Sequence, residues 1–246
     1  MQRHATKVPL LIALVGLVVS ACGVGTPDLK DPDEILTKSV AAFEGADSVR
    51  LVAEVDGTLS LDLTRLGQAT DMSLAGTMLT ADLDLRNHSS HVSAAVPAFL
   101  GLSADIVVIG PDTWMKISLS GDKYDKSATD ATSPTDPDAV IRSVTDFLAR
   151  PEVRPTKNDD AACGSKSCYQ VEIDLTAADL ATLMPGTDLG DAIVVVKLLI
   201  EKDTHYPVSA TVSVVGSGVG DLTLTLAMSD WNKSLIITAP PADQAN

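Results

Sequence analysis

Residues 194–228 read VVVKLLIEKDTHYPVSATVSVVGSGVGDLTLTLAM, and apolar side chains recur at every second position along most of this stretch. A period of two is typical of strands that bury one face and expose the other. The turn at Lys202-Asp203-Thr204 separates the first strand from the second. The stretch predicts antiparallel strands whose apolar residues share one face: Val194, Val196, Leu198, Ile200, Val208, Ala210, Val212, Val214, Leu222, Leu224, Leu226 and Met228.

The same alternation recurs elsewhere in the chain. It runs over residues 51–63 and 81–86, over 115–119 after the turn Gly110-Pro111-Asp112, and over 169–175. A last strand is predicted over Leu235 to Thr238. Together these segments predict a large antiparallel sheet with one apolar face and one solvated face.

Three helical patterns can supply cover for the apolar face. The first begins at the capping residue Asp31 and ends at Gly45. The second runs from Asp136 to about Arg150, and the third begins with the capping box Thr176-x-x-Asp179. The second helix has an apolar stripe made of Val140, Ile141, Val144, Phe147 and Leu148. Two or three helices beside a large antiparallel sheet indicate the α+β class.

The N-terminal segment has the organisation of a secretory signal. Arg3 and Lys7 precede a short apolar run that is too brief to span a bilayer. The run ends in Val19-Ser20-Ala21-Cys22, which resembles a bacterial lipobox. We therefore expect residues 1–21 to be removed and Cys22 to carry a diacylglycerol, which would attach the chain to the cell membrane on its outer side. Residues 22–30 would form the lipidated tether.

Charge limits the partners of the remaining chain. After residue 21 it has 16 basic and 33 acidic residues, a formal charge of −17. This balance excludes an electrostatic nucleic-acid binder, because such proteins need a basic surface. No second long apolar run or linker divides the chain, so one domain is predicted over residues 31–241, followed by a tail over 242–246.

Two cysteines remain once Cys22 is assigned. Cys163 and Cys168 flank a Gly-Ser turn, and an even pair in an exported protein predicts a structural disulfide at a hairpin tip. A redox or metal pair is the alternative. The C-x4-C spacing and the lack of a nearby histidine disfavour that alternative.

Residues that could perform a reaction are scarce. His88 and His91 lie three apart, which places them on opposite sides of a strand, and no third ligand stands near them. The sequence lacks the G-x-S-x-G, H-E-x-x-H and P-loop patterns. We therefore predict no catalytic site, no metal and no cofactor. The apolar sheet face then has two interpretations: a packed aliphatic core or a cavity for acyl chains.

Three segments carry a family resemblance: Asp105 to Gly110 with Trp114-Met115-Lys116, Leu199 to His205, and Leu224 to Asn232 with Pro240-Pro241. With the lipobox and the order of helices, they resemble the mycobacterial LppX/LprA/LprF/LprG family of cell-envelope lipoproteins. The resemblance covers nearly all of the mature chain and is loosest over residues 57–100. The pair Cys163 and Cys168 does not match the general pattern of that family.

The resemblance implies a half-barrel of strands wrapped around helices, similar to the LolA/LolB carriers, with an apolar cavity between the two layers. It also implies a multi-acylated lipid or glycolipid as ligand, transport between membrane layers, and a membrane lipid transporter as a candidate partner. The residues that strand parity and the second helix then place at the cavity are Leu51, Val55, Leu83, Ile106, Val108, Met115, Ile117, Val144, Phe147, Leu148, Val171, Ile173, Val196, Leu198, Val212, Leu224 and Leu226. A scaffold lipoprotein with a filled core and an envelope hydrolase are the alternatives.

Overall fold

The computed structural model describes residues 28–61, 70–128, 142, 145–150, 153–179, 191–216 and 220–246. The predicted signal peptide and Cys22 lie outside the described residues. Val140, Ile141 and Val144 of the predicted second helix lie outside them too. No helix in the described part of the chain is long and apolar enough to cross a membrane.

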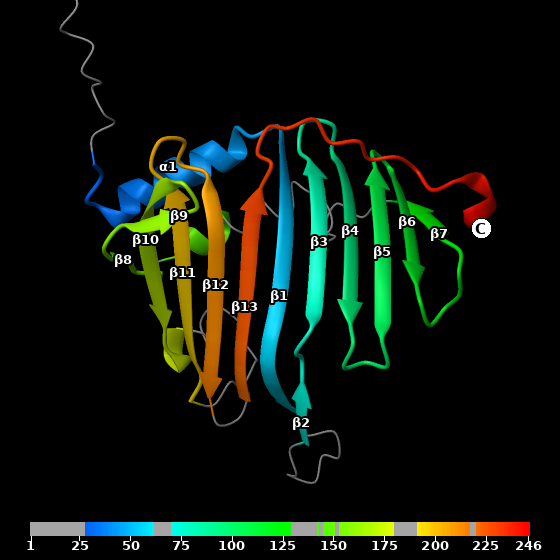
Figure 1. The fold of residues 1–246 in the computed structure, drawn as a ribbon, viewed down its shortest axis with the longest axis horizontal. Coiled ribbons are helices and arrows are strands. Elements are labelled where there is room, and N and C mark those ends of the chain that lie inside the picture. Colours follow the sequence, from blue (N-terminus) through cyan, green and yellow to red (C-terminus); the bar gives the residue numbers. More distant parts are fainter. Residues whose placement is uncertain are drawn as a thin grey trace, which may run out of the picture.

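One antiparallel sheet of 13 strands forms the body of the described chain (Figure 1). Its order is β7-β6-β5-β4-β3-β1-β13-β12-β11-β10-β8, while β2 pairs with β1 and β9 pairs with β10. The sheet is curved and not closed. The strands are β1 Ser48–Leu61, β2 Thr70–Ser73, β3 Thr77–Asp84, β4 Ser89–Val96, β5 Leu102–Ile109, β6 Asp112–Ile117, β7 Asp125–Ala128, β8 Pro155–Lys157, β9 Ala161–Cys163, β10 Lys166–Leu175, β11 Ile193–Glu201, β12 Pro207–Gly216 and β13 Gly220–Ser229.

Helix α1 (Pro32–Glu44) begins and ends where the sequence predicts. The side chain of Asp31 accepts a hydrogen bond from the backbone N–H of Asp33 at 3.0 Å, and Gly45 ends the helix. Leu36 lies on its buried side. The helix therefore covers part of one face of the sheet, near one end of the strands (Figure 1).

The other two predicted helices are described in part. Residues 145–148 are helical, and residues 177–179 form the start of the third helix. There the backbone N–H and the hydroxyl of Thr176 donate to the carboxylate of Asp179, at 2.9 and 2.6 Å. The capping box that the sequence predicts is therefore formed.

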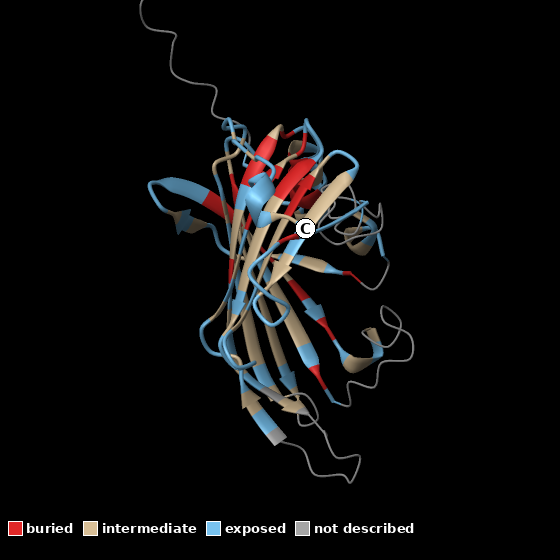
Figure 2. Ribbon diagram, turned by 90° about the vertical axis from the view of Figure 1, so that its right-hand side faces the viewer, coloured by how far each residue is buried: buried red, intermediate tan, exposed pale blue. Residues whose placement is uncertain are grey.

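Two clusters of buried side chains make up the core, and both include residues of or next to α1. Many of them lie near the end of the sheet where α1 lies (Figure 2). The first cluster contains Leu29, Ile35, Leu36, Val153, Tyr169, Val171, Ile173, Leu175, Ala192 and Ile200. The second contains Phe43, Ala46, Val49, Ala81, Leu83 and Leu85.

The two edges of the sheet are short and polar. All four residues of β7 are exposed, and β8 has three residues and begins with Pro155. A C-terminal segment with the 3-10 helix η1 (Ala242–Gln244) reaches the start of β7, where Tyr124 pairs with Ala245. The N–H of Tyr124 donates to the carbonyl of Gln244 at 2.8 Å, which fastens this tail beside the edge.

The prediction of a last strand over Leu235 to Thr238 is wrong. Those residues form no β-ladder, and Ile236 is 89% exposed. The reason is topological: β13 already pairs with β12 on one side and β1 on the other, so it has no free edge for a further hairpin. After β13, positive φ angles at Asp230 and Asn232 turn the chain across the strand ends instead (Figure 1).

Candidate functional site

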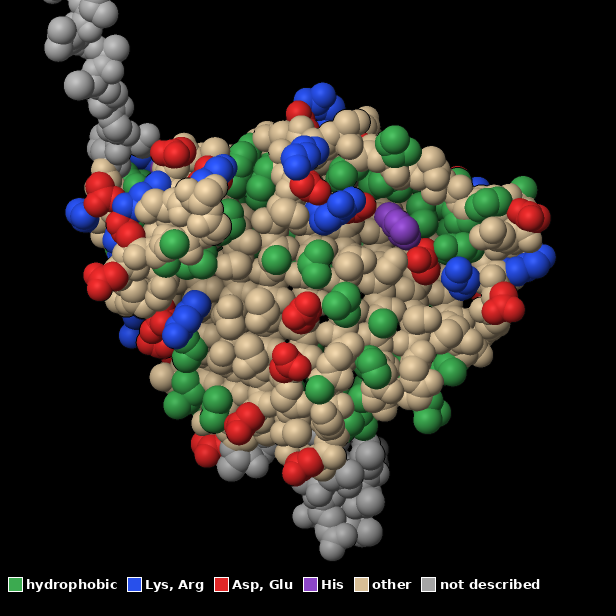
Figure 3. Space-filling view, in the orientation of Figure 1, with side chains coloured by type: hydrophobic (Ala, Val, Ile, Leu, Met, Phe, Trp, Pro, Cys, Tyr) green, Lys and Arg blue, Asp and Glu red, His purple; other side chains and the backbone are tan. Residues whose placement is uncertain are grey.

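The two faces of the sheet differ in polarity. One face, which we call the outer face, carries ion pairs such as that of Arg50 with Asp82, whose Nε and Oδ1 atoms are 2.7 Å apart. Figure 3 shows the molecule from this side, with acidic and basic side chains scattered among hydrophobic and other residues. The opposite, inner face is apolar and is the face that α1 covers.

The predicted lining residues that belong to strands all lie on the inner face, as the backbone register shows. Leu51 pairs with Met228, and Leu226 pairs with both Ala53 and Ala210. Leu198 in turn lies opposite Ala210 and Val171. The same alternation extends through β3, β4, β5 and β6 to Leu83, Ile106, Val108, Met115 and Ile117.

An apolar cavity of about 170 Å³ lies between α1 and the inner face. Thr145 and Leu148 of the second predicted helix also border it. Its wall contains few polar groups, since Ser39 and Thr145 are the polar side chains in it. The remaining wall residues are Leu36, Val40 and Phe43 from α1, with Leu51, Leu198, Pro207, Ala210, Leu226 and Met228 from the sheet.

The predicted lining residues divide into groups in the structure. Leu51, Leu148, Leu198 and Leu226 border the cavity. Others fill the core: Val171 and Ile173 are fully buried in the first cluster, Leu83 belongs to the second, and Val108 is 2% exposed. Phe147 and Val196 pack against the first cluster. The predicted lining residues that belong to neither the cavity wall nor a cluster are Val55, Ile106, Val108, Met115, Ile117, Val212 and Leu224.

Several cavity residues were missing from the predicted lining. Ala210 and Met228 have the same parity as the predicted strand residues, so the alternation was the signal that could have included them. Val40 and Phe43 lie on the apolar stripe of α1 that the sequence already indicates. Pro207 gives no such signal, because it occupies the first position of β12.

The volume of the cavity, about 170 Å³, limits the size of the ligand that can enter it. A cavity of about 150 Å³ lined by aliphatic and aromatic groups stays dry and accepts one small hydrocarbon. Pockets for whole organic ligands usually measure about 300–1,000 Å³. The site is therefore large enough for a short hydrocarbon segment, and a longer one requires α1 or Leu148 to move away from the sheet.

A network of contacts fixes the chain where it enters α1. The hydroxyl of Tyr169 accepts a hydrogen bond from the backbone N–H of Leu29 at 3.1 Å. Lys202 bonds Asp28 at 2.8 Å and also pairs with Asp160. Hydrogen bonds from Lys202 and Lys30 lower the pKa of Asp28 to about 2, so its carboxylate stays ionised and keeps this entry point in place.

The ring of Tyr169 lies next to His205 in the turn between β11 and β12. The two ring centroids are 6.4 Å apart, and Tyr169 is 1% exposed. The Nε2 atom of His205 is buried without a hydrogen-bond partner among the described residues. Burial and the nearby Lys38 lower the pKa of His205, which favours its neutral form against the aromatic ring.

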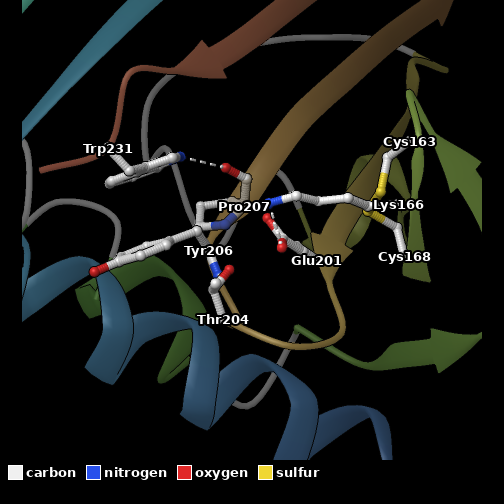
Figure 4. Close-up of a disulfide and its surroundings, with 8 residues drawn as sticks. All are labelled: Cys163, Lys166, Cys168, Glu201, Thr204, Tyr206, Pro207 and Trp231. Atoms are coloured by element: carbon white, nitrogen blue, oxygen red, sulfur yellow. Dashed lines mark hydrogen bonds and ion pairs between the residues drawn. A yellow bond between two sulfur atoms is a disulfide. The ribbon is translucent and has the colours of Figure 1, made fainter. Parts of the chain in front are cut away.

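The predicted disulfide is formed between Cys163 and Cys168. It lies at the β9–β10 hairpin, with the two Cα atoms 5.9 Å apart (Figure 4). Beside it the ammonium of Lys166 contacts the carboxylate of Glu201 at 2.6 Å. Glu201 is buried, so the pair ties the hairpin to the end of β11.

A polar cluster surrounds Asp105 on the outer face, beside a depression of about 570 Å³. Tyr124 and Ser93 donate to Asp105 at 2.7 and 3.0 Å, and Nε2 of His91 lies 3.2 Å from it. Burial alone would raise the pKa of Asp105, but these neighbours lower it below its ordinary value. Burial and the bond to Asp105 raise the pKa of Tyr124 to about 12. The cluster is therefore an ionised acceptor surrounded by donors.

His88 and His91, the two histidines considered as metal ligands, lie apart in the structure. His91 points to Asp105 from β4, whereas His88 lies in the β3–β4 turn with a φ of 49°. In the described part of the chain, no group of three or more histidine, cysteine or acidic side chains is placed to hold a metal ion.

Comparison with known proteins starts from the fold, because no family model and no curated protein matches the sequence. LprF from Mycobacterium bovis aligns with a TM-score of 0.55 at 18% identity, over 85% of this chain and 96% of LprF. The lipoprotein LppX from Mycobacterium tuberculosis aligns with a TM-score of 0.53 at 16% identity, over 84% of this chain and 97% of LppX. The chain has the LprF/LppX fold.

The LprF/LppX fold confirms the predicted α+β class with its large, open, antiparallel sheet. It also confirms, at the level of the fold, the resemblance carried by the sequence motifs. The alignment covers nearly the whole of both solved chains. The aligned part of this chain therefore corresponds in extent to nearly all of the LprF and LppX structures.

Proposed function

We propose that this protein is a membrane-anchored lipoprotein that binds acyl chains of envelope lipids between α1 and the inner face and carries them between membrane layers. The observation that carries the proposal is the apolar cavity of about 170 Å³ bordered by α1, the second helix and the sheet. No bond is made or broken in this function. The ligand class that suits the wall is aliphatic, because leucine, valine and methionine dominate it.

Binding is driven by removal of hydrocarbon from water. Each buried methylene contributes about 0.8 kcal/mol, so even an eight-carbon segment supplies about 6 kcal/mol. That gain supports separation of α1 from the sheet, which would extend the cavity along the inner face towards Val212 and Leu224. The polar headgroup would remain at the mouth, in contact with water.

The proposed anchor is a diacylglycerol on Cys22. Asp28 follows Cys22 by six residues, and Lys202 holds it at the end of the sheet where α1 lies, which supports attachment from that end. A membrane lipid transporter as partner and a multi-acylated glycolipid as cargo belong to the same proposal.

Native mass spectrometry tests the cargo. The chain from residue 22 with Cys22→Ala, expressed in a mycobacterial host, is expected to carry a stoichiometric adduct that yields a multi-acylated lipid on extraction. A protein of unadducted mass, unchanged after incubation with mycobacterial lipids, would contradict the carrier function. It would favour a scaffold with a packed core, consistent with the fully buried Val171 and Ile173.

A fractionation experiment tests the anchor. The full chain is expected in the membrane fraction, and Cys22→Ser is expected in the aqueous fraction, because two acyl chains bind bilayers stably whereas the remaining chain has a charge of −17 that opposes attachment to anionic lipid. Ser20→Ala, two positions away, is the control and should leave the protein in the membrane. Equal membrane retention of the Cys22→Ser chain would refute lipidation there.

A further inference from the structure

Large apolar side chains are exposed mainly at one end of the sheet. We call this the far end: the end where β3, β5 and β11 begin and β4, β6 and β12 finish (Figure 1). Among the eight such side chains in the described residues, six lie there, and Met115 and Ile236 do not. The six are Met78, Phe99, Leu100, Leu119, Ile193 and Val215.

The β4–β5 loop presents Leu100 to solvent from a defined turn. The N–H of Leu102 donates to the carbonyl of Phe99 at 3.0 Å, and the two residues between them, Leu100 and Gly101, have φ angles of 55° and 73°. Positive φ at both central positions is typical of a type I′ turn, where Asn-Gly is strongly preferred. Leucine is therefore strained at this position, and it is 95% exposed.

Folding does not explain a strained leucine that packs against almost nothing. Backbone strain of this kind persists where it serves a function. Leu119 lies at the tip of the neighbouring β6–β7 connection and is 71% exposed. The N–H of Ser118 donates to the carbonyl of Ser103 at 2.9 Å, so the two tips lie side by side.

The exposed apolar side chains of the two tips have no charged residue directly beside them in the sequence. Residues 97–101, which form the whole β4–β5 loop, contain no charged side chain, and in the β6–β7 connection (residues 118–124) the charges of Asp122 and Lys123 come only after Gly121. Loop tips of soluble domains are usually polar, so an uncharged β4–β5 loop with exposed Phe99 and Leu100, next to exposed Leu119, matches an apolar surface. The overall negative charge favours a neutral over an anionic surface.

The tips also lie opposite the proposed anchor. The N-terminal chain is held by Lys202 at the α1 end, and the eight-residue strands β4 and β5 separate the two ends by about 27 Å. The six steps from Cys22 to Asp28 span at most about 20 Å. The proposed anchor thus attaches to one end of the molecule, and the exposed apolar tips lie at the other.

We propose that the far end is a membrane-docking surface, at which Phe99, Leu100 and Leu119 enter the interface of a bilayer of neutral headgroups. This rests on the proposed carrier function, because a carrier must meet the lipid surface with which it exchanges cargo. The partner that suits this surface is a zwitterionic bilayer. Docking would bring the apolar side chains into the acyl boundary while the acidic strands remain in water.

Vesicle sedimentation tests the docking surface. The chain from residue 22 with Cys22→Ala is expected to bind phosphatidylcholine vesicles, and the further change Leu100→Asn is expected to weaken binding about tenfold, from the apolar area removed. Asparagine accepts positive φ, so the turn should persist, as circular dichroism and the melting temperature would show. Ile236→Asn removes a similarly exposed side chain away from the far end and should bind like the parent.

Two measurements separate this proposal from the carrier function. Leu100→Asn should retain its lipid adduct in native mass spectrometry, and a cavity-filling variant should lose the adduct yet still bind vesicles. Equal vesicle binding by parent and Leu100→Asn would overturn the docking surface. A parent that dimerises, with Leu100→Asn monomeric and no vesicle binding by either, would overturn it too and identify a second copy as the partner.

Discussion

Replacing Ala210 with phenylalanine is expected to abolish lipid loading while leaving the protein folded. Ala210 borders the apolar cavity from β12, at the position that pairs with Leu198 and Leu226. A phenyl ring there occupies much of the 170 Å³ between the sheet and α1. Loss of as few as two methylene contacts, at about 0.8 kcal/mol each, lowers affinity about tenfold. Native mass spectrometry of the purified variant measures the loss directly.

The matched control is Thr211→Phe. Thr211 follows Ala210 in the same strand, so its side chain lies on the outer face, away from the cavity. The same ring added there should leave lipid loading unchanged. Should Ala210→Phe fail to fold, Leu198→Trp fills the cavity from β11 and takes its place. Full lipid occupancy in a folded cavity-filled variant would place the cargo elsewhere on the protein.

Removing the side chain of Tyr169 should have the largest effect on stability. Tyr169 is among the largest fully buried side chains described, and Lys157 and Lys202 lie over its ring. Truncation of a buried aromatic residue typically costs about 3–5 kcal/mol, so Tyr169→Ala should lower the free energy of unfolding by that amount. Denaturant titration of the purified chain measures the change.

Tyr169→Phe isolates the role of the hydroxyl group. The ring stays, but the buried N–H of Leu29 loses its acceptor, which should cost about 1–3 kcal/mol. If the phenylalanine variant is as stable as the parent, the contact between Tyr169 and Leu29 does not hold the N-terminal chain in place.

Strand parity made much of the fold predictable. Leu51, Leu198 and Leu226 come from strands far apart in the sequence, yet each belongs to an alternating segment, and the register places all three on one face. The reason is physical: a one-residue slip would move the whole apolar set into water. The helix caps could also be predicted from the sequence, because the carboxylates of Asp31 and Asp179 accept the hydrogen bonds expected at the two helix starts.

Strand β4 could not be predicted in the same way. Its sequence, Ser89 to Val96, is rich in serine and alanine and lacks an apolar alternation. The small size of Ser90 has a packing reason, because this residue lies between the larger Leu83 on β3 and Val108 on β5. A small residue at such a position gives no apolar alternation, although Ser90 is fully buried.

The candidate site was the least predictable part. Leu198 borders the cavity while its pairing partner Val171 is fully buried, although both have inward parity. The alternation shows which residues lie on the inner face. The path of α1 across that face decides which of them border the cavity and which pack against one another. That path depends on long-range contacts, such as the bond from Leu29 to Tyr169, which no local pattern contains.

The short, polar edges of the sheet have a consequence for self-association. An open sheet with long flat edges invites edge-to-edge pairing and growth into fibres. Here Pro155 lacks an N–H donor, Asp125 and Lys126 place charge on β7, and the C-terminal tail bonds the backbone of Tyr124. The protein can thus keep its sheet open along one side without offering a template for polymerisation.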